Sequence, residues 1–480
     1  MFAAGSTLVM MAVAIVAAFA CVITVVGAIQ LTADRKHGYF HLVIPAILIT
    51  SGLTIALSGR SMEFNAVQLM TDTVVRNPLS VWVQRIGTIV ILTISLERII
   101  SHFSRQPTLL GAAPMLTLCF VAYWAGSTLS PMLFSAYPAF SHESCYALII
   151  GVGALLLTAE EGEQVLLTAR DSMFALQLAS YLMIFINAGL VLDTNYTQGF
   201  IPGLPRFSGL APHALTMGMM AQLSLLCLWT RPYANQRLNR AAWTLGLLSL
   251  LLAQSKTGWI SFFFCATVMY LCQHSTKLRH RLSDATRPQL GITLTLGITI
   301  IIAGVGFAAL FGGLDTRLDS FLHSESGAQL TSLTGRDVIW AVAYEEWLRH
   351  PVFGYGPNFL SLPYRLGIGL PNATHGHNQY MDLLPRAGLI GAIPLTVYLF
   401  AMLSLSVRHA VASRGLTLAL FIAIALRAIS EVPLTMRNGY SPEFISHLLL
   451  LVLLTACNAR FALFKEKPAG TTHLRTSPQT

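Results

Sequence analysis

The stretch GLIGAIPLTVYLFAMLSLSV, residues 388–407, runs for 20 residues without a charged side chain. An α-helix of about 20 apolar residues is long enough to cross the hydrocarbon core of a bilayer. Comparable stretches recur along the chain, and they begin near residues 5, 40, 81, 108, 144, 172, 210, 241, 258, 290, 388, 417 and 445. Unpaired backbone amides cost several kcal/mol in lipid, so such segments must be helical. The sequence therefore predicts an all-α polytopic membrane protein with about 12–13 transmembrane helices.

The overall composition agrees with this fold class. The chain is 54% hydrophobic and only 11% charged, whereas an average soluble domain carries about 25% charged residues. Residues 1–32 are apolar and lack a basic start, so we do not expect a cleaved signal peptide. The seven cysteines lie in or beside apolar segments, and their spacing predicts neither a disulfide framework nor a zinc site.

The loops that alternate along the chain differ strongly in positive charge. One set carries 17 cations, which are Arg35, Lys36, Arg105, Arg170, Arg231, Arg237, Arg240, Lys277, Arg279, Arg281, Arg287, Arg408, Arg414, Arg460, Lys465, Lys467 and Arg475. The short loops of the other set carry five, which are Arg60, Arg76, Arg206, Lys256 and Arg437. Cytoplasmic loops are enriched in Lys and Arg, so the first set is predicted to be cytoplasmic. The net charge of +9 then reflects membrane topology, and no nucleic-acid partner is expected.

This topology places a long polar stretch, residues 314–385, on the external side. We expect transmembrane helices over residues 1–311, a helical periplasmic cap over 312–387, further transmembrane helices over 388–464 and a cytoplasmic tail over 465–480. Within the cap, TGRD (residues 334–337) resembles a capping box that opens a helix to about Arg349. Asn378 is placed to cap a second helix, which Pro385 is expected to kink before the chain enters the membrane.

The cap contains THGHNQY, residues 374–380, with the only closely spaced external histidines. A neutral imidazole near pH 7 can accept a proton from a sugar hydroxyl, although a lone exposed histidine is usually inert. His375 and His377 have no acidic ligand near them in the sequence, so a metal site is not expected. The cap also lacks paired carboxylates arranged for glycoside hydrolysis, and no cytoplasmic loop has the Asp-x-Asp element of nucleotide-sugar enzymes.

Two external cations, Arg206 and Lys256, are predicted to lie at the membrane face. They could extend to lipid phosphates as isolated cations do, or they could bind an anionic lipid head-group such as a diphosphate. Arg85 and Arg427 lie inside apolar segments, where a charge costs about 2.5–3.5 kcal/mol or more. That cost favours either a polar cavity or an ion pair, for example between Arg427 and Glu431.

Two longer stretches resemble the O-antigen ligase/polymerase superfamily: TGRDVIWAVAYEEWLRHPVFGYGPNFL (334–360) and THGHNQYMDLLPRAGLIGAIPL (374–395). That group holds lipopolysaccharide O-antigen ligases, Wzy-type polysaccharide polymerases and exopolysaccharide polymerases. The positions that carry the resemblance are Gly335, Arg336, Trp340, His350, Pro351, Gly354, Gly356, His377, Asn378, Tyr380, Gly388, Leu389 and Gly391. Two earlier elements also fit, PRFSG (205–209) and QSKTG (254–258), whereas the first 200 residues match only as apolar spans.

The resemblance implies a metal-independent, inverting membrane glycosyltransferase of the GT-C type that uses no cofactor and takes an undecaprenyl-diphosphate-linked glycan as donor. By this resemblance Arg206 and Lys256 would hold the diphosphate, and His377 would orient or deprotonate the acceptor hydroxyl. The supporting residues would be Arg336, His375, Asn378, Tyr380 and Arg427. Lys256 departs from the arginine more common at its position, and the Ser-Lys-Thr version is similar to the exopolysaccharide polymerase branch.

We therefore expect a polysaccharide polymerase of the bacterial inner membrane whose active site faces the periplasm. Its partners would be the lipid-linked oligosaccharide, membrane lipid, and possible helpers of two kinds, a chain-length regulator and a flippase. A ligase that transfers the glycan to lipid A-core is the close alternative. A flippase is the alternative of another class, but it would be expected to show internal repeats and a charged central cavity, and the sequence has no such repeat.

Overall fold

We describe a computed structural model of the chain. It describes residues 38–62, 77–105, 110–194, 203–283, 336–371, 373–437 and 439–465, together with residues 22, 23, 26, 27, 30, 196 and 201. The spans predicted near residues 5 and 290, the predicted capping residue Thr334 and residues 466–480 of the expected tail lie outside this part of the chain.

The protein is an all-α polytopic membrane protein, as the sequence predicts. Four of the described helical segments are long and apolar enough to cross a membrane, and four shorter apolar ones accompany them. The elements on which the bundle depends are α2 (Val43–Ala56), α4 (Pro78–Arg105), α5 (Pro114–Trp124), the π-helical turn η2 (Ala125–Leu129), α6 (Ser130–Phe134), α7 (Tyr146–Leu155), α8 (Ala159–Ile186), α9 (Ala188–Val191), α10 (Ala214–Thr230), α11 (Gln236–Leu252), α12 (Lys256–Ser283), α18 (Gln379–Arg408), α19 (Leu416–Ser430) and α20 (Ile445–Lys465). The strands in the described residues are a two-residue pair, β1 (Leu192–Asp193) and β2 (Arg206–Phe207).

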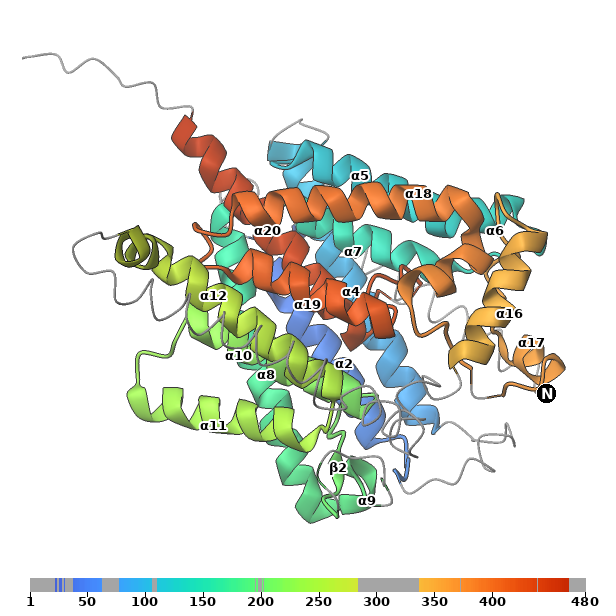
Figure 1. Ribbon diagram of the computed structural model, residues 1–480, viewed down its shortest axis with the longest axis horizontal. Coiled ribbons are helices and arrows are strands. Elements are labelled where there is room, and N and C mark those ends of the chain that lie inside the picture. Colours follow the sequence, from blue (N-terminus) through green and yellow to red (C-terminus); the bar gives the residue numbers. More distant parts are fainter. Residues whose placement is uncertain are drawn as a thin grey trace, which may run out of the picture.

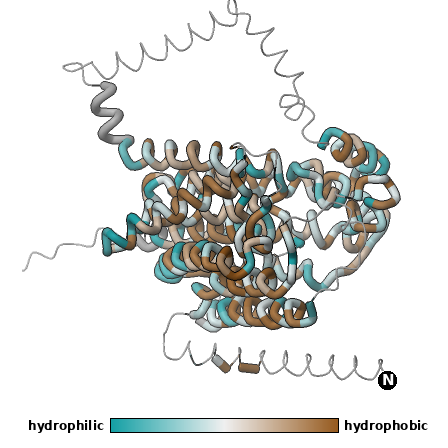
Figure 2. Tube along the Cα trace, turned by 90° about the horizontal axis from the view of Figure 1, so that it is seen from below, coloured by the Kyte–Doolittle hydropathy of each residue, from teal (hydrophilic) through white to brown (hydrophobic). Residues whose placement is uncertain are grey.

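The bundle is built around α20. Residues 448–452 of this helix are all completely buried, so neighbouring helices cover every face of it. The outer helices expose large apolar side chains instead, among them Phe185, Phe263, Ile393 and Phe400. In Figure 2 brown hydrophobic segments run along the helices, and teal hydrophilic segments gather near many helix ends. This is the pattern of a bundle whose outer surface faces lipid.

The two ends of the bundle differ. At one end lie α16 (Arg336–Arg349), α17 (Leu362–Gly367) and the first turns of α18, and the C-terminal ends of α12 and α20 lie at the opposite end (Figure 1). The α16–α17 segment forms a small core of its own around Ile339, Ala343 and Phe359. Helix α16 covers the residues predicted for the first cap helix.

Helix α18 breaks at Gly388 and not, as predicted, at Pro385. Gly388 has φ 58° and ψ −155°, and a Cβ at this position would lie 2.3 Å from the carbonyl oxygen of Val352. The segment that ends α16 packs into the break, because Pro351 and Val352 accept hydrogen bonds from the amides of Leu389 (2.9 Å) and Ile390 (3.1 Å). A glycine is required here by both the backbone angle and the close approach.

Helix α8 also differs from the prediction, because it begins at Ala159 and contains Arg170, which we expected in a loop. Thr158 and Glu161 form a capping box that starts the helix early. Arg170 is buried within the helix, where it pairs with Asp171 (2.8 Å) and lies 3.9 Å from the ring centre of Tyr233.

Candidate active site

The histidine loop, residues 373–378, connects the α16–α17 segment to α18. Asn378 caps α18, as predicted, because its side-chain oxygen accepts hydrogen bonds from the amides of Tyr380 (2.9 Å) and Met381 (3.2 Å). Gly376 is held from both sides: its amide donates to Asp382 Oδ1 (2.9 Å), and its carbonyl accepts from Trp340 Nε1 (2.7 Å). Trp340 of α16 and the His377-Asn378 pair thus meet at this loop.

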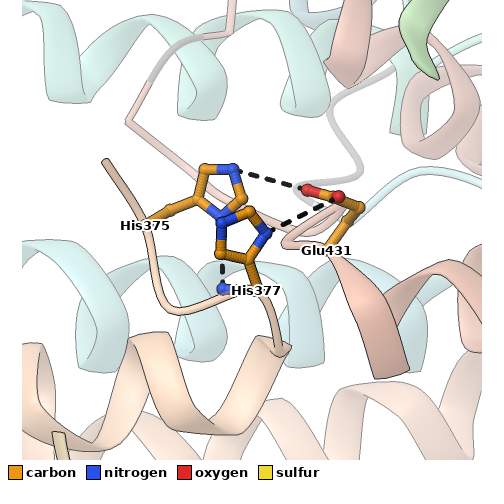
Figure 3. A group of neighbouring side chains, drawn as sticks. All are labelled: His375, His377 and Glu431. Atoms are coloured by element: carbon orange, nitrogen blue, oxygen red, sulfur yellow. Dashed lines mark hydrogen bonds and ion pairs between the residues drawn. The ribbon is translucent and has the colours of Figure 1, made fainter. Parts of the chain in front are cut away.

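The two histidines of this loop face Glu431, the residue that ends α19 (Figure 3). His375 Nε2 lies 3.4 Å from Glu431 Oε2, and His377 Nδ1 lies 3.8 Å from Glu431 Oε1. The histidine side chains are about a quarter exposed (27% and 26%), and the glutamate is 13% exposed. One carboxylate therefore lies beside two imidazoles, at a site that remains accessible to a ligand. The expectation that no acidic group accompanies the histidines was wrong.

The hydrogen bonds of His375 define its protonation. Its Nδ1 accepts a hydrogen bond from the backbone amide of His377 (3.2 Å), so in the neutral ring the proton is on Nε2, which faces Glu431. Both ring nitrogens of His375 are therefore engaged. This residue can support the loop and the carboxylate, but it has no free lone pair with which to accept a proton from a substrate.

His377 is the better candidate for a base. Its φ of 47° lies in the left-handed region, which is uncommon for residues other than glycine and often marks a functional constraint. Its Nδ1 is buried and makes no hydrogen bond within the described residues, although Glu431 lies within 3.8 Å. A small rotation would bring Nδ1–H onto the carboxylate. That tautomer leaves Nε2 with a lone pair that can accept a proton.

The electrostatics of the loop favour a neutral His375 and an ionised Glu431. Burial and the nearby His377 lower the pKa of His375 below its ordinary value, and the opposing effect of Glu431 is smaller. Burial raises the pKa of the Glu431 carboxyl, but His377, His375 and Arg427 together outweigh that effect and lower the net pKa. At neutral pH the site thus pairs an ionised Glu431 with an uncharged His375.

These three side chains also have the number and type of groups that bind a metal ion, since one ligand atom from each lies within 4.8 Å of the others. The tautomer of His375 opposes this use. A histidine that binds a metal through Nε2 carries its proton on Nδ1 and donates it, whereas here Nδ1 accepts the amide hydrogen of His377. The present geometry fits a metal ion poorly.

A cavity of about 480 Å³ adjoins the site and opens beside the N-terminus of α12. We call it the α12 pocket. Its polar lining includes Gln222, Ser255, Thr257, Arg427, Glu431 and Ser446. The guanidinium of Arg427 contacts the Met219 sulfur, and no carboxylate of the described residues lies within ion-pair distance of it. The predicted Arg427–Glu431 ion pair therefore does not form, although both residues line the same cavity. A guanidinium without a carboxylate partner leaves the pocket ready for an anion.

Arg206 and Lys256 lie close to this pocket but are not part of its lining. Arg206 Nε donates to the carbonyl of Ala253 (3.2 Å), next to the QSKTG element, and its guanidinium lies 4.4 Å from the ring centre of Tyr196. Lys256 is exposed and is the first residue of α12, where the helix dipole opposes a positive charge. The local structure thus does not explain a lysine at this position, whereas a helix N-terminus does favour a bound anion.

The loop that carries Arg206 is fixed by Arg60. The Arg60 guanidinium donates to the carbonyls of Leu190 (3.1 Å), Ala211 (2.9 Å) and Gly209 (2.6 Å) and to other groups of the same loop. Burial lowers the pKa of Arg60 to about 10, so it still carries its charge at pH 7. Arg60 is therefore a positioning residue and not a free cation.

The remaining predicted site residues have other positions. Tyr380 bonds through its hydroxyl to Thr396 (2.8 Å) on the same helix, which is a structural role. Arg336 begins α16, and the contact of that helix with the histidine loop is made by Trp340. Sequence reasoning missed Glu431 as a partner of the histidines and missed Arg437 and Asp382 behind the loop. An acidic residue directly after an apolar span, as in Ser430-Glu431, was the available signal.

The fold and the site define a multi-pass membrane protein with a histidine–carboxylate site and a cation-lined pocket at one end of the bundle. Residues 241–396 match the family model for O-antigen ligase. This segment includes α12, α16, α17 and the histidine loop, and the match supports the resemblance to the O-antigen ligase/polymerase superfamily. A search of curated proteins found no match. The family match supports an O-antigen ligase/polymerase-type activity in glycan assembly.

Proposed function

We propose that the protein is an inverting, metal-independent polysaccharide polymerase that transfers a glycan from undecaprenyl diphosphate to a sugar hydroxyl of a lipid-linked repeat unit. The observation that carries this proposal is the junction of the histidine–glutamate group with the α12 pocket. Glu431, which faces the candidate base His377, and Arg427, the cation of the pocket, are one helical turn apart, and both line the pocket. The base and the anion site are therefore neighbours.

The anion site suits a diphosphate for three reasons. Arg427 is a guanidinium with no carboxylate partner in the described residues, Lys256 is an exposed cation, and the N-terminus of α12 carries the positive end of the helix dipole. Guanidinium groups bind phosphate oxygens through two parallel hydrogen bonds, whereas an ammonium acts as a point charge. Arg206, held beside Ala253, would add a further positive charge at the rim.

The reaction would proceed in one displacement. The acceptor hydroxyl loses its proton to His377 and its oxygen attacks the anomeric carbon of the donor sugar. The bond between that carbon and the diphosphate oxygen breaks, and the diphosphate leaves with the electron pair. Cations fixed in advance stabilise the charge that develops on the leaving group. Attack from the face opposite the diphosphate inverts the anomeric centre.

The test of polymerase activity uses purified protein in nanodiscs with one substrate, an undecaprenyl-diphosphate-linked repeat unit. We expect a ladder of longer lipid-linked glycans with no other acceptor present. If the product forms only when lipid A-core is added, the protein is a ligase, and the polymerase proposal is wrong. The control is His377→Ala, which should give no ladder in either mixture.

The proposed orientation puts the histidine end of the bundle in the periplasm, as the 17-versus-five cation asymmetry indicates. Cysteine substitutions at position 330 and at position 280 should behave oppositely in intact cells. We expect a membrane-impermeant thiol reagent to label position 330 and to reach position 280 only after permeabilisation. The reverse pattern would remove the site from the periplasmic side.

A further inference from the structure

A second polar cavity, also of about 480 Å³, lies on the other side of the histidine loop. We call it the π-turn pocket, because the π-helical turn η2 forms one wall of it. The opposite walls are the first turns of α18 and residues 435–437, with Pro357 of the α16–α17 segment at the edge. Its polar lining includes Tyr123, Ser127, Thr128, Gln379, Asp382 and Arg437. Nothing in the proposed transfer step uses this cavity.

The charges at this cavity do not balance. One carboxylate, Asp382, lies between two guanidiniums, Arg386 (2.9 Å) and Arg437 (3.4 Å), which leaves one positive charge in excess. Arg386 is buried and fully engaged: Nε and Nη2 donate to Asp382, and Nη1 donates to the carbonyls of Pro357 and Phe359. The excess charge therefore belongs to Arg437.

Arg437 is bound loosely by comparison. Within the described residues its one hydrogen bond runs from Nη2 to Asp382 at 3.4 Å, and its side chain is 36% exposed. The other guanidinium hydrogens are available to a ligand in the cavity. Arginine can offer two parallel donors to a carboxylate or a phosphate, so the free edge of Arg437 is suited to an anionic group.

The wall of the cavity that η2 forms has an unusual backbone conformation. The turn η2 interrupts the α5–α6 helix with π-helical geometry, which is rare and is often found at functional sites. It places the hydroxyls of Ser127 and Thr128 at the cavity, while Gly126 lies against α18 so closely that a Cβ would be 2.2 Å from the Ile390 carbonyl. The turn thus combines tight packing against α18 with two hydroxyls, the groups that bind sugar hydroxyls.

The cavity is coupled to the histidine loop by direct bonds. Asp382 accepts the amide hydrogen of Gly376 (2.9 Å), one residue before His377. Gln379 is locked as well, because its oxygen accepts from the Leu434 amide (3.0 Å) and its nitrogen donates to the Tyr123 hydroxyl (3.4 Å). A ligand on Arg437 would therefore lie against the back of the same loop that carries the base.

We propose that the π-turn pocket binds an anionic substituent of the acceptor glycan, a carboxylate or a phosphate on a sugar, through Arg437, with the sugar held by Ser127 and Thr128. This inference rests on the proposed function and adds to it the class of acceptor, an acidic glycan. The donor diphosphate is assigned to the α12 pocket, so the two pockets take the two substrates from opposite sides of the histidine loop.

The test measures binding, not transfer, on full-length purified protein in nanodiscs. The probes are a soluble oligosaccharide that contains glucuronic acid, the same oligosaccharide after reduction of its carboxyl group, and a sugar phosphate of similar size. We expect the acidic oligosaccharide to bind about 10- to 100-fold more tightly than the reduced one, the range for a hydrogen bond to a charged group. The sugar phosphate shows which anion the pocket prefers.

Three variants locate the effect. Arg437→Gln should abolish the preference for the acidic probe, and Thr128→Val should weaken both oligosaccharides while keeping the preference. Arg349→Gln removes an exposed guanidinium of α16, 67% exposed, and should change nothing. If Arg437→Gln does not fold, Arg437→Lys keeps the charge without the planar fork and should reduce the preference at least several-fold.

Equal binding of the acidic and reduced oligosaccharides overturns the inference, and so does a preference that survives Arg437→Gln. Loss of binding on addition of undecaprenyl diphosphate would assign the pocket to the donor and also overturn it. Failure here is distinguishable from failure of the proposed function. A missing preference alongside normal polymer formation removes only this inference, whereas a normal preference without transfer removes only the polymerase proposal.

Discussion

Two ionic groups lie on either side of the histidine loop, and they are built differently. Asp382 is buried and accepts four hydrogen bonds, two from Arg386 and one each from Gly376 and Arg437, of which the last is long at 3.4 Å. Glu431 is more exposed, and its nearest partners are imidazole nitrogens at 3.4 and 3.8 Å. In the first group Asp382 and Arg386 are fully engaged, and only Arg437 keeps donors free. The second leaves donors and acceptors open.

We infer from this difference that the Asp382 group supports the loop and that the Glu431 group takes part in the reaction. A buried carboxylate with complete partners fixes the backbone at Gly376, and the loop can then hold His377 at an unfavourable φ. The bonds of a catalytic group are often long in the free enzyme and shorten only when substrate binds. The long distances at Glu431 are therefore what a site without substrate is expected to show. Substitutions in the Asp382 group and in the Glu431 group should have different consequences.

The largest effect is expected from His377→Ala. A general base contributes typically about 10²–10⁴-fold to a rate, so transfer should fall by that order while donor binding is nearly unchanged. The measurement is the initial rate of polymer formation, with donor affinity determined in parallel. His377→Asn separates the alternatives, because a residue that only shapes the loop would tolerate asparagine at positive φ. A near-normal rate of polymer formation by either variant, with the protein folded, would contradict the assignment of His377 as the base.

Asp382→Ala should instead destabilise the fold. It leaves the buried guanidinium of Arg386 without its carboxylate, and breaking a buried ion pair in this way costs about 3–5 kcal/mol. We expect a clearly lower unfolding temperature in detergent and lower expression. Asp337→Ala, on the exposed face of α16, is the matched control and should be silent. An unchanged unfolding temperature for Asp382→Ala would mean that the two ionic groups do not differ as argued.

Glu431→Gln keeps the shape of the side chain but removes its charge. We expect transfer to fall by about 10-fold, because a hydrogen bond to a charged group is worth about 1.5–3 kcal/mol. The pH profile should move as well. The pKa of His375 is already below its ordinary value because of burial, so the bond from the His377 amide to His375 should persist as the pH falls through about 6.5.

The acidic limb of the pH–activity profile is expected to depend on His375. Protonation of His375 Nδ1 sets it against the amide hydrogen of His377, which breaks the bond that shapes the loop. The negative charge of Glu431 raises the pKa of His375, so its removal should move the acidic limb to lower pH. Glu345→Gln on α16 is the control with an exposed carboxylate. A limb that moves to higher pH would show that Glu431 does not act on His375.

The sequence predicted the fold class and the residues of the loop, because both depend on local patterns. Apolar stretches identify helices, and the THGHNQY motif carries its own helix cap at Asn378. The position of the break in α18 was not predictable in this way. Pro385 is a strong local signal, but the break depends on residues 351–352 packing against Gly388, a contact between segments far apart in the chain.

The same limit applies to the site. His377 and Glu431 are separated by more than 50 residues, and only the packing of α18 beside α19 brings them together. The predicted pairing of Arg427 with the nearest acid in the sequence was therefore wrong, since the Glu431 carboxylate faces the histidines. Arg437 looked like an ordinary loop cation, and its excess charge is visible only once Asp382 and Arg386 lie beside it.

A smaller effect is expected for the donor side. Lys256→Ala should weaken donor binding and transfer together, and Arg206→Ala should do the same. Lys256→Arg should retain activity within a few-fold, because the positive charge at the N-terminus of α12 is kept and arginine binds phosphate well. Polymer rate and affinity for the lipid-linked donor would be measured for each. A severe loss for Lys256→Arg would mean that the lysine acts through proton transfer and not through charge.

No effect at all is expected from removal of metal ions. Activity of the purified enzyme should be unchanged after EDTA treatment and after the addition of Mg²⁺ or Mn²⁺. The physical reason is the tautomer of His375, whose Nδ1 accepts an amide hydrogen and so leaves the proton on the nitrogen that faces Glu431. If EDTA abolishes transfer and a divalent ion restores it, then His375, His377 and Glu431 are ligands in the active enzyme. In that case the contrast between the two ionic groups would remain, but Glu431 would hold a cation in place of orienting a base.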